Sequence, residues 1–259
     1  MKTIAIINQK GGTGKTTTAR QIAAGLSKEF SVLLVDLDPQ QSLTFIMGES
    51  GKKGKTIADL LQESVDAEPG HKFNTREAIR PGEVDLIAGS ANIAAADTVL
   101  ADVTGREYKL KEVLAPIKKD YHYCIIDTAP TLGTLTVNAL TAAQIAIAPA
   151  QADILSVLAL EQLYSTITTV KRYCNPRLSF KGIVLTRYNG RAVLSREIAE
   201  RLEQAAQQYG TKLFNTRIRE CTALKEADLM QKSIFDYAPR SNAALDYAFL
   251  IDEILDSKD

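Results

Sequence analysis

A short stretch near the start of the chain, INQKGGTGKTTTA at residues 7–19, limits the possible folds more than any other. An apolar run typical of a β-strand, TIAIIN at 3–8, leads into it, and a helical pattern starts at Lys15. The glycines between them let successive backbone N–H groups point at one position, and the start of a helix adds its positive end. A strand, a glycine-rich turn and a helix that opens with Lys-Thr are typical of a loop that binds phosphate groups.

Each residue type in such a loop has an expected task. Lys15 would reach the β- and γ-phosphates of a nucleotide, and the hydroxyl of Thr16 would ligate Mg²⁺. A surface turn with an exposed lysine is the alternative, and the flanking strand and helix argue against it. The sequence therefore predicts that ATP and Mg²⁺ bind here, in a cradle completed by Lys10, Gly11, Gly12, Thr13, Gly14 and Thr17.

The loop departs from the general pattern GxxxxGK[ST], because Gln9 stands where the first glycine is expected and a second lysine, Lys10, follows it. Two lysines so close repel each other unless something strongly negative lies near both. The form KGGxGK[ST] resembles the deviant phosphate loop of the ParA/MinD family of ATPases. That resemblance implies an ATP-sandwich homodimer, in which Lys10 crosses the interface to the other subunit's phosphates and acts in catalysis as an arginine finger does.

Two further motifs follow in the order that this family has them. LLVDLDPQQS resembles the family's DxDPQ segment, which implies that Asp38 positions the attacking water and that Asp36 lies nearer the Mg²⁺ shell. Two acids that cap a turn before Pro39 are the alternative. YCIIDTAP places Asp127 at the end of an apolar strand, where a carboxylate holds Mg²⁺ through water. Residues 128–130 resemble the family's second switch.

Recognition of the base is harder to locate in the sequence. GIVLTRYNGR and DYAPRSNAA resemble the late segments that surround adenine and ribose in the family. The candidates in the second segment are Pro239 and Arg240.

The order of the segments predicts an α/β fold, that of the P-loop NTPases, with a mostly parallel twisted sheet and helices on both faces. Strands are expected at 3–8, 32–37, 84–89, 123–128, 145–150 and 182–188, and helices at 15–28, 56–64, 107–119, 134–143, 154–173, 195–209 and 242–256. The glycine- and lysine-rich 48–55 and the stretch 65–83, with Pro69, Gly70, Pro81 and Gly82, are expected to be irregular. A single ParA-like ATPase domain over 1–259 is expected, without a helix-turn-helix domain before it.

Net charge and cysteine content limit the binding partners and the cellular location that can be expected. The formal net charge is zero, so any nucleic-acid binding must come from a local patch. Three cysteines far apart suggest neither a disulfide framework nor a zinc site, and with no signal peptide a cytoplasmic location is expected. The acidic ending LDYAFLIDEILDSKD differs from the basic membrane-binding helix of MinD-type proteins, so no membrane partner is expected.

One part of the chain carries a local positive excess. Between residues 171 and 240, fourteen Lys and Arg stand against seven Asp and Glu, an excess of seven. A face that contacts nucleic-acid phosphates needs such an excess, although a solvated helical face is the alternative. By resemblance to Soj-type proteins, double-stranded DNA would be bound without sequence preference by Arg191, with Arg217, Arg219 and Lys225 supplying charge at shifted positions.

The resemblance thus implies an ATPase for plasmid or chromosome partition, associated with the nucleoid and stimulated by a ParB-type centromere-binding protein. One alternative is a related ATPase that positions another cargo, such as a protein cluster or the cellulose-synthesis machinery. Another is a metabolic ligase of the same fold, against which Lys10 and the DxDPQ segment argue.

Overall fold

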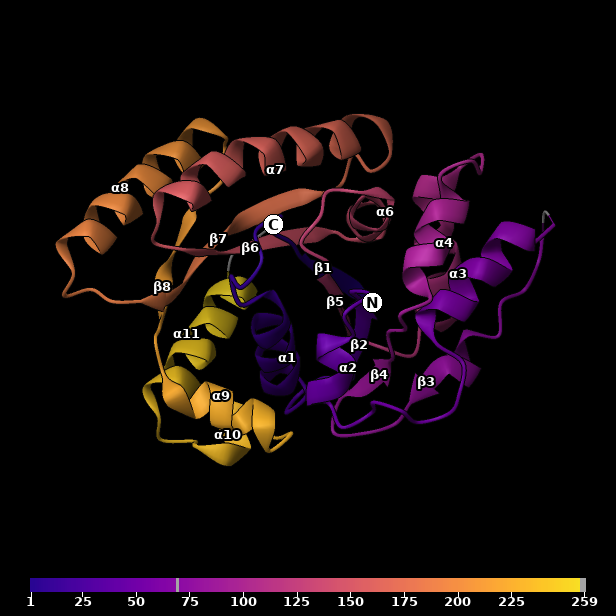
Figure 1. Cartoon of the computed structure of the whole chain (residues 1–259), viewed down its shortest axis with the longest axis horizontal. Coiled ribbons are helices and arrows are strands. Elements are labelled where there is room, and N and C mark those ends of the chain that lie inside the picture. The colour runs from indigo at the N-terminus through magenta and orange to yellow at the C-terminus, as the bar shows by residue number, and fades with distance from the viewer. Residues whose placement is uncertain (69, 257–259) are drawn as a thin grey trace.

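A computed structural model describes residues 1–68 and 70–256 and contains one eight-stranded sheet (Figure 1). The strand order is β3-β4-β2-β5-β1-β6-β7-β8, and every neighbouring pair is parallel except β3 and β4. The fold class predicted from the sequence is therefore confirmed. The strands are β1 (Lys2–Ile6), β2 (Val32–Leu37), β3 (Ile79–Arg80), β4 (Asp85–Ile87), β5 (Tyr123–Thr128), β6 (Ile145–Gln151), β7 (Ser179–Tyr188) and β8 (Leu213–Arg219).

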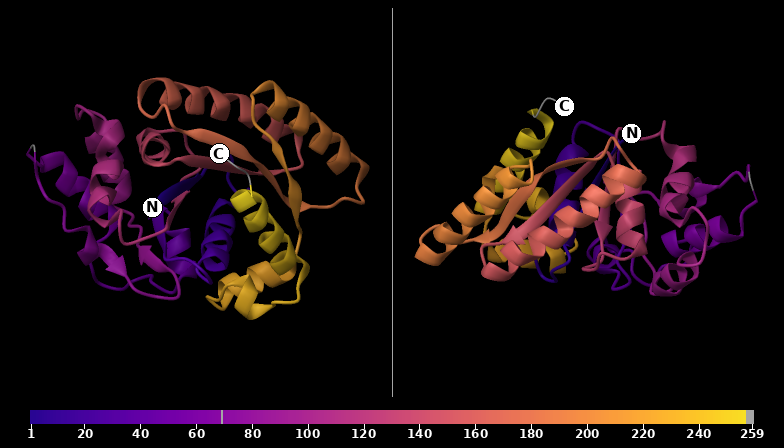
Figure 2. Two further views of the ribbon diagram at one scale, coloured as in Figure 1. Left: turned by 180° about the vertical axis from the view of Figure 1, so that it is seen from behind. Right: turned by 90° about the horizontal axis from the view of Figure 1, so that it is seen from above.

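The central strands are apolar throughout because helices bury both of their faces. In β1, Ile4 and Ile6 contribute to the core on one face, and Ala5 contributes to the core on the other. Figures 1 and 2 show these two layers of helices around the sheet. One layer contains α3 (Ile57–Asp66), α4 (Ile93–Leu100), α5 (Lys109–Leu114), α6 (Thr134–Ala142), α7 (Ile154–Tyr173) and α8 (Val193–Gln208). The other contains α1 (Lys15–Leu26), α2 (Ser42–Ile46), α9 (Thr222–Leu229), α10 (Ile234–Tyr237) and α11 (Asn242–Asp256).

Two expected segments differ from the structure. The stretch 65–83 is not wholly irregular, because a 3-10 turn, η1 (Thr75–Ala78), and strand β3 lie within it; Pro69 lies outside the described residues. The buried hydroxyl of Thr75 donates to the Val113 carbonyl at 2.5 Å and fixes this segment to the domain. The helix expected at 107–119 is three short pieces, η2 (Arg106–Tyr108), α5 and η3 (Ala115–Ile117). Pro116 lies in the first turn of the last piece, where its missing N–H is tolerated because it cannot donate a helical hydrogen bond.

The edge strand β8 and the short helices α2, α4, α9 and α10 were not expected from the sequence, whereas 48–55 is irregular as predicted. Carboxylates of α11 cover part of the open edge of β8. Glu253 accepts hydrogen bonds from the backbone N–H groups of Asn215 (3.0 Å) and Thr216 (3.1 Å), and Asp246 accepts one from that of Arg219 (3.0 Å). Side chains thereby satisfy backbone donors that another strand could otherwise use.

Candidate nucleotide site

The glycine-rich loop lies at the carboxyl end of β1, where ligands bind in open parallel sheets. Gly12 (φ 75°) and Gly14 (φ 83°) both adopt the left-handed backbone conformation, which a residue with a Cβ disfavours. Gly14 is the residue that precedes the first turn of α1, so the loop passes directly into the positive end of that helix. The sequence pattern and the local backbone agree on a phosphate cradle.

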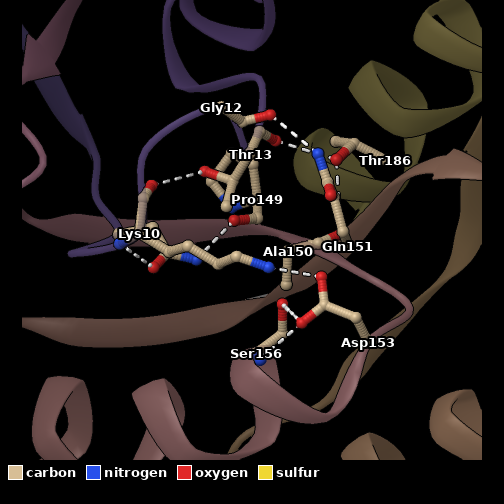
Figure 3. Close-up of polar contacts among 10 residues, drawn as sticks. Lys10, Gly12, Thr13, Pro149, Ala150, Gln151, Asp153, Ser156 and Thr186 are labelled. Carbon is tan, nitrogen blue, oxygen red and sulfur yellow. Dashed lines mark hydrogen bonds and ion pairs between the residues drawn. The ribbon is translucent and has the colours of Figure 1, made fainter.

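Side chains from distant strands hold the loop in place (Figure 3). Asn8 donates from Nδ2 to the Pro149 carbonyl at 2.7 Å and accepts from the Lys10 N–H at 2.9 Å. Gln151 donates to the Gly12 carbonyl and Thr186 to the Thr13 carbonyl, both at 2.8 Å. These bonds fix the position of the loop relative to β6 and β7. Sequence reasoning missed Asn8, Gln151 and Thr186, although each stands next to or near the carboxyl end of a predicted strand.

The two lysines of the loop have different surroundings. Lys15 is buried, its Nζ donates to the Lys10 carbonyl at 3.3 Å, and burial lowers its pKa against the opposing effect of Asp127 and Asp38. Lys10 is partly exposed and its Nζ forms an ion pair with Asp153 (Figure 3). Asp153 also caps α7 by accepting from the Ser156 N–H at 2.9 Å. Burial tends to raise the pKa of Asp153, but the hydrogen bonds from Lys10 and Ser156 outweigh it and lower the pKa.

Asp127 is the most unusual acid in the site. It is fully buried at the end of β5, in register with Asp36 on β2 and Ile6 on β1, and among the described residues neither carboxylate oxygen has a hydrogen-bond partner. Burial, reinforced by the charge of Asp36, raises its pKa well above the ordinary range, while the Thr16 hydroxyl and Lys15 act in the opposite direction. A buried carboxylate without partners next to a threonine hydroxyl fits a hydrated Mg²⁺, which prefers oxygen ligands and keeps several waters. Bound Mg²⁺ would neutralise phosphate charge.

The two acids of the DxDPQ segment are held differently. Asp36 is buried, and its Oδ2 accepts from the backbone N–H of Thr44 (2.8 Å) and from its hydroxyl (2.7 Å), while its Oδ1 accepts from the Asp38 N–H (3.1 Å). These contacts fix the turn after β2 and hold the Asp36 carboxylate close enough for its charge to act on Asp127, and its place near the Mg²⁺ shell stays a prediction. Asp38 accepts only from the Gln40 N–H at 2.9 Å among the described residues, and its charge acts on both Lys15 and Asp127.

The predicted base-binding pair lies in the exposed turn between α10 and α11. The hydroxyls of Tyr247 on α11 and Thr18 on α1 lie 3.2 Å apart. Further along the same two helices, Ile251 packs against Gly25, so the helices run in the same direction. The start of α11, and with it Pro239 and Arg240, therefore lies toward the end of α1 that carries the loop. This placement is compatible with the predicted role.

The residues predicted to bind DNA are not equivalent. Arg191 and Lys225 are exposed. The guanidinium of Arg217 lies 4.9 Å from the ring of Tyr188 and donates to its hydroxyl at 3.1 Å. Arg219 forms a two-point ion pair with Asp246, at 2.6 and 3.0 Å. Arg219 is thus already engaged within the protein.

The local positive excess of residues 171–240 does not form one face. Lys181 lies at the beginning of β7 and Lys212 just before β8, whereas Arg187 and Arg217 lie toward the ends of these strands. A ten-residue strand such as β7 is about 30 Å long. These four charges therefore lie toward both ends of the sheet, so the positive excess counted along the sequence does not form a single face.

The doubly covered parallel sheet and its loop define a P-loop nucleotide-binding protein. A family model described as an AAA domain matches residues 1–180. The chain is 35% identical over 255 residues to the sporulation initiation inhibitor protein Soj of Bacillus subtilis, with 98% of each chain covered. It is 34% identical over 259 residues to the chromosome-partitioning ATPase Soj of Thermus thermophilus, covering 98% of this chain and 96% of the relative.

The likeness extends to solved structures. That of cobyrinic acid a,c-diamide synthase from Mycobacterium smegmatis, with bound ATP analog and magnesium, is 33% identical with a TM-score of 0.83 and covers 98% of this chain and 94% of that one. The chain belongs to the ParA/Soj family of P-loop ATPases. It is an ATPase whose cofactors are ATP and Mg²⁺. No helix within the described residues is both long and apolar enough to cross a membrane.

Proposed function

We propose that this single-domain protein is a DNA-partition ATPase that moves a plasmid or a chromosome on the nucleoid. In the ATP state it forms a sandwich homodimer that binds duplex DNA without sequence preference, and a ParB-type centromere-binding protein stimulates its slow ATP hydrolysis. The likeness to the Soj proteins supports this function. The observation that carries the dimer is the separation of the two lysines, because Lys10 is held away from Lys15 by Asp153 on the partly exposed rim of the loop.

The proposal gives each site residue a task. Lys15 and the N–H groups of the loop hold the nucleotide phosphates, and Thr16 and Asp127 hold Mg²⁺ through its ligand shell. Asp38 orients the attacking water. Lys10 leaves Asp153 when a second subunit docks and brings its positive charge to that subunit's phosphates, where charge develops during hydrolysis.

Binding to non-specific duplex DNA and mass by light scattering, measured on the same samples with ATP, ADP or no nucleotide, test this function. Wild type should dimerise and bind DNA only with ATP. Lys10→Ala should abolish both, and Arg191→Ala should weaken DNA binding while dimers persist. Lys15→Ala serves as the control that lacks productive nucleotide binding.

The outcomes test the DNA cargo and the ATP-dependent dimer separately. ATP-dependent dimers that ignore DNA at low salt would refute DNA partition and favour the positioning of a non-DNA cargo. A wild type that stays monomeric with ATP would refute the sandwich dimer itself.

A further inference from the structure

A large hollow lies at the end of the sheet opposite the nucleotide loop. Its volume is about 1040 Å³, and residues at or just before the starts of β1, β6, β7 and β8 line it together with parts of α5 and the segment after η3. These four strands are neighbours in the sheet (Figure 1). Because they are parallel, their starts meet at one edge, and the hollow and the loop are separated by about the length of a strand.

Positive charge dominates the hollow. Among the described residues that line it there is no Asp or Glu, whereas six are cationic: Lys2, Lys111, Lys118, Arg177, Lys181 and Lys212. Among the described residues, no carboxylate lies within ion-pair distance of Lys111, Lys118 or Arg177, and Lys212 pairs with Glu253 at 3.2 Å. In a protein without net charge, such a concentration creates a local field that attracts anions.

Three of the uncharged polar side chains that line the hollow are engaged within the fold. Asn175 donates to the Leu140 carbonyl at 2.9 Å, the Thr211 hydroxyl donates to the Phe180 carbonyl at 2.7 Å, and the Gln144 side chain accepts from a backbone N–H at 2.8 Å. Within the described part of the chain, Lys111, Lys118 and Arg177 are the flexible cationic side chains of the hollow that form no ion pair. Such side chains can bind a chain of regularly spaced phosphates, because contacts to phosphates need charge but no fixed pattern of donors and acceptors.

We propose that this hollow is a second DNA-contact surface, which takes a stretch of phosphodiester backbone of duplex DNA. The choice of DNA as the partner rests on the proposed function, whereas the surface itself is separate from Arg191 and from the nucleotide loop. In a dimer whose two loops face each other, the two hollows lie at the outer ends, so one dimer could hold two DNA segments.

A matched pair of double charge reversals tests the proposal. Lys118→Glu with Arg177→Glu alters the hollow, and Lys53→Glu with Lys72→Glu makes the same change in net charge at exposed lysines outside it. Fluorescence anisotropy of a labelled duplex is measured across a salt series with ATP, ADP and no nucleotide. The hollow variant should lose on the order of tenfold in DNA affinity at low salt, and its log–log salt slope should fall by about two. ATP-dependent dimerisation should be unchanged.

The outcomes distinguish this proposal from the partition function. If the two double variants bind DNA with equal affinity, the hollow is not a DNA-contact surface. If Arg191→Ala alone loses DNA binding, the hollow is refuted in the same way, but the partition function is not. DNA binding that needs the hollow but ignores ATP would support the hollow and refute the nucleotide switch. A last measurement uses inorganic tripolyphosphate and the ADP-loaded protein. If tripolyphosphate binds to wild type but not to the hollow variant, and the hollow variant keeps its DNA affinity, the ligand of the hollow is a compact anion and not DNA.

Discussion

Asp127 is where the requirements of folding and of nucleotide binding conflict most directly. Its buried carboxylate has no hydrogen-bond partner in the part of the chain that the structure describes, and folding raises its pKa. The folded protein therefore binds the Asp127 proton more tightly than the unfolded chain does. Stability falls as pH rises from the unfolded pKa of about 4 through the raised folded pKa, and it stays lower at higher pH. Asp127→Asn should therefore increase the free energy of unfolding of the nucleotide-free protein at neutral pH by about 1–3 kcal/mol.

Thermal unfolding of both proteins, at neutral pH and at about pH 5, measures this effect, and the difference between them should shrink at the lower pH. The same variant should lose the extra stabilisation that Mg²⁺ gives to the nucleotide complex. If Asp127→Asn is less stable than wild type at neutral pH, the prediction is wrong and the buried Asp127 carboxylate does not destabilise the fold.

A second prediction concerns the residue that holds Lys10. Asn caps a helix about as well as Asp does, so Asp153→Asn should keep the cap of α7 while weakening the ion pair to Lys10. A partly exposed ion pair contributes about 0.2–1 kcal/mol. ATP-dependent dimerisation, followed by light scattering against protein concentration, should strengthen by a corresponding factor of about two to five.

The double variant Lys10→Ala with Asp153→Asn provides the control. It should behave as Lys10→Ala alone, because the release of an absent lysine has no effect. Weaker dimerisation of Asp153→Asn would mean that Asp153 itself contributes to the interface.

The sequence could predict the residues of the site that recur at a fixed local spacing. Lys15 and Thr16 belong to the glycine-rich motif, and Asp127 ends a recognisable apolar strand. The anchors Asn8 and Thr186 could not be predicted in the same way, because their bonds join positions more than a hundred residues apart. Only the strand order of the sheet brings such positions together.

At the scale of elements, α1 and α11 approach closely at Gly25. A Cβ built there would lie 2.2 Å from Cδ1 of Ile251 and 3.3 Å from the ring of Phe235. The better helix propensity of alanine should not compensate for this overlap, so Gly25→Ala should lower the free energy of unfolding by about 1–3 kcal/mol. Urea denaturation measures the change.

Ile251→Val tests the cause, since it removes the methyl group that the new Cβ would meet. Alone it should cost about 0.5–1.5 kcal/mol. Combined with Gly25→Ala, it should cost clearly less than the sum of the two. Strict additivity would mean that the overlap at Ile251 is not the source of the destabilisation.

Strands and helices were predictable from the sequence where burial requires a recognisable pattern of apolar residues. The apolar runs of β2 and β5 match their predicted bounds at both ends. β8 (LFNTRIR) was missed because its buried residues follow no period of two, and its polar side chains resemble those of a loop. The short helices α9 and α10 have too few turns to show a period.

At the scale of the whole molecule, sequence position is a poor guide to where charge lies. The positive excess of residues 171–240 is continuous along the chain, yet each strand carries its first and last residues to opposite ends of the sheet. A count along the sequence therefore combined charges that lie near the nucleotide loop with charges that lie about the length of a strand from it.

The covered edge of β8 has a consequence for the solubility of the protein. A molecule without net charge has little long-range repulsion to keep its copies apart, and an open strand edge invites pairing between them. Glu253→Ala should expose the N–H groups of Asn215 and Thr216 and increase turbidity on storage near neutral pH, whereas Asp252→Ala, with the same change of charge on an exposed neighbour, should not. The last helix would thus limit self-association at short range, where the overall charge cannot.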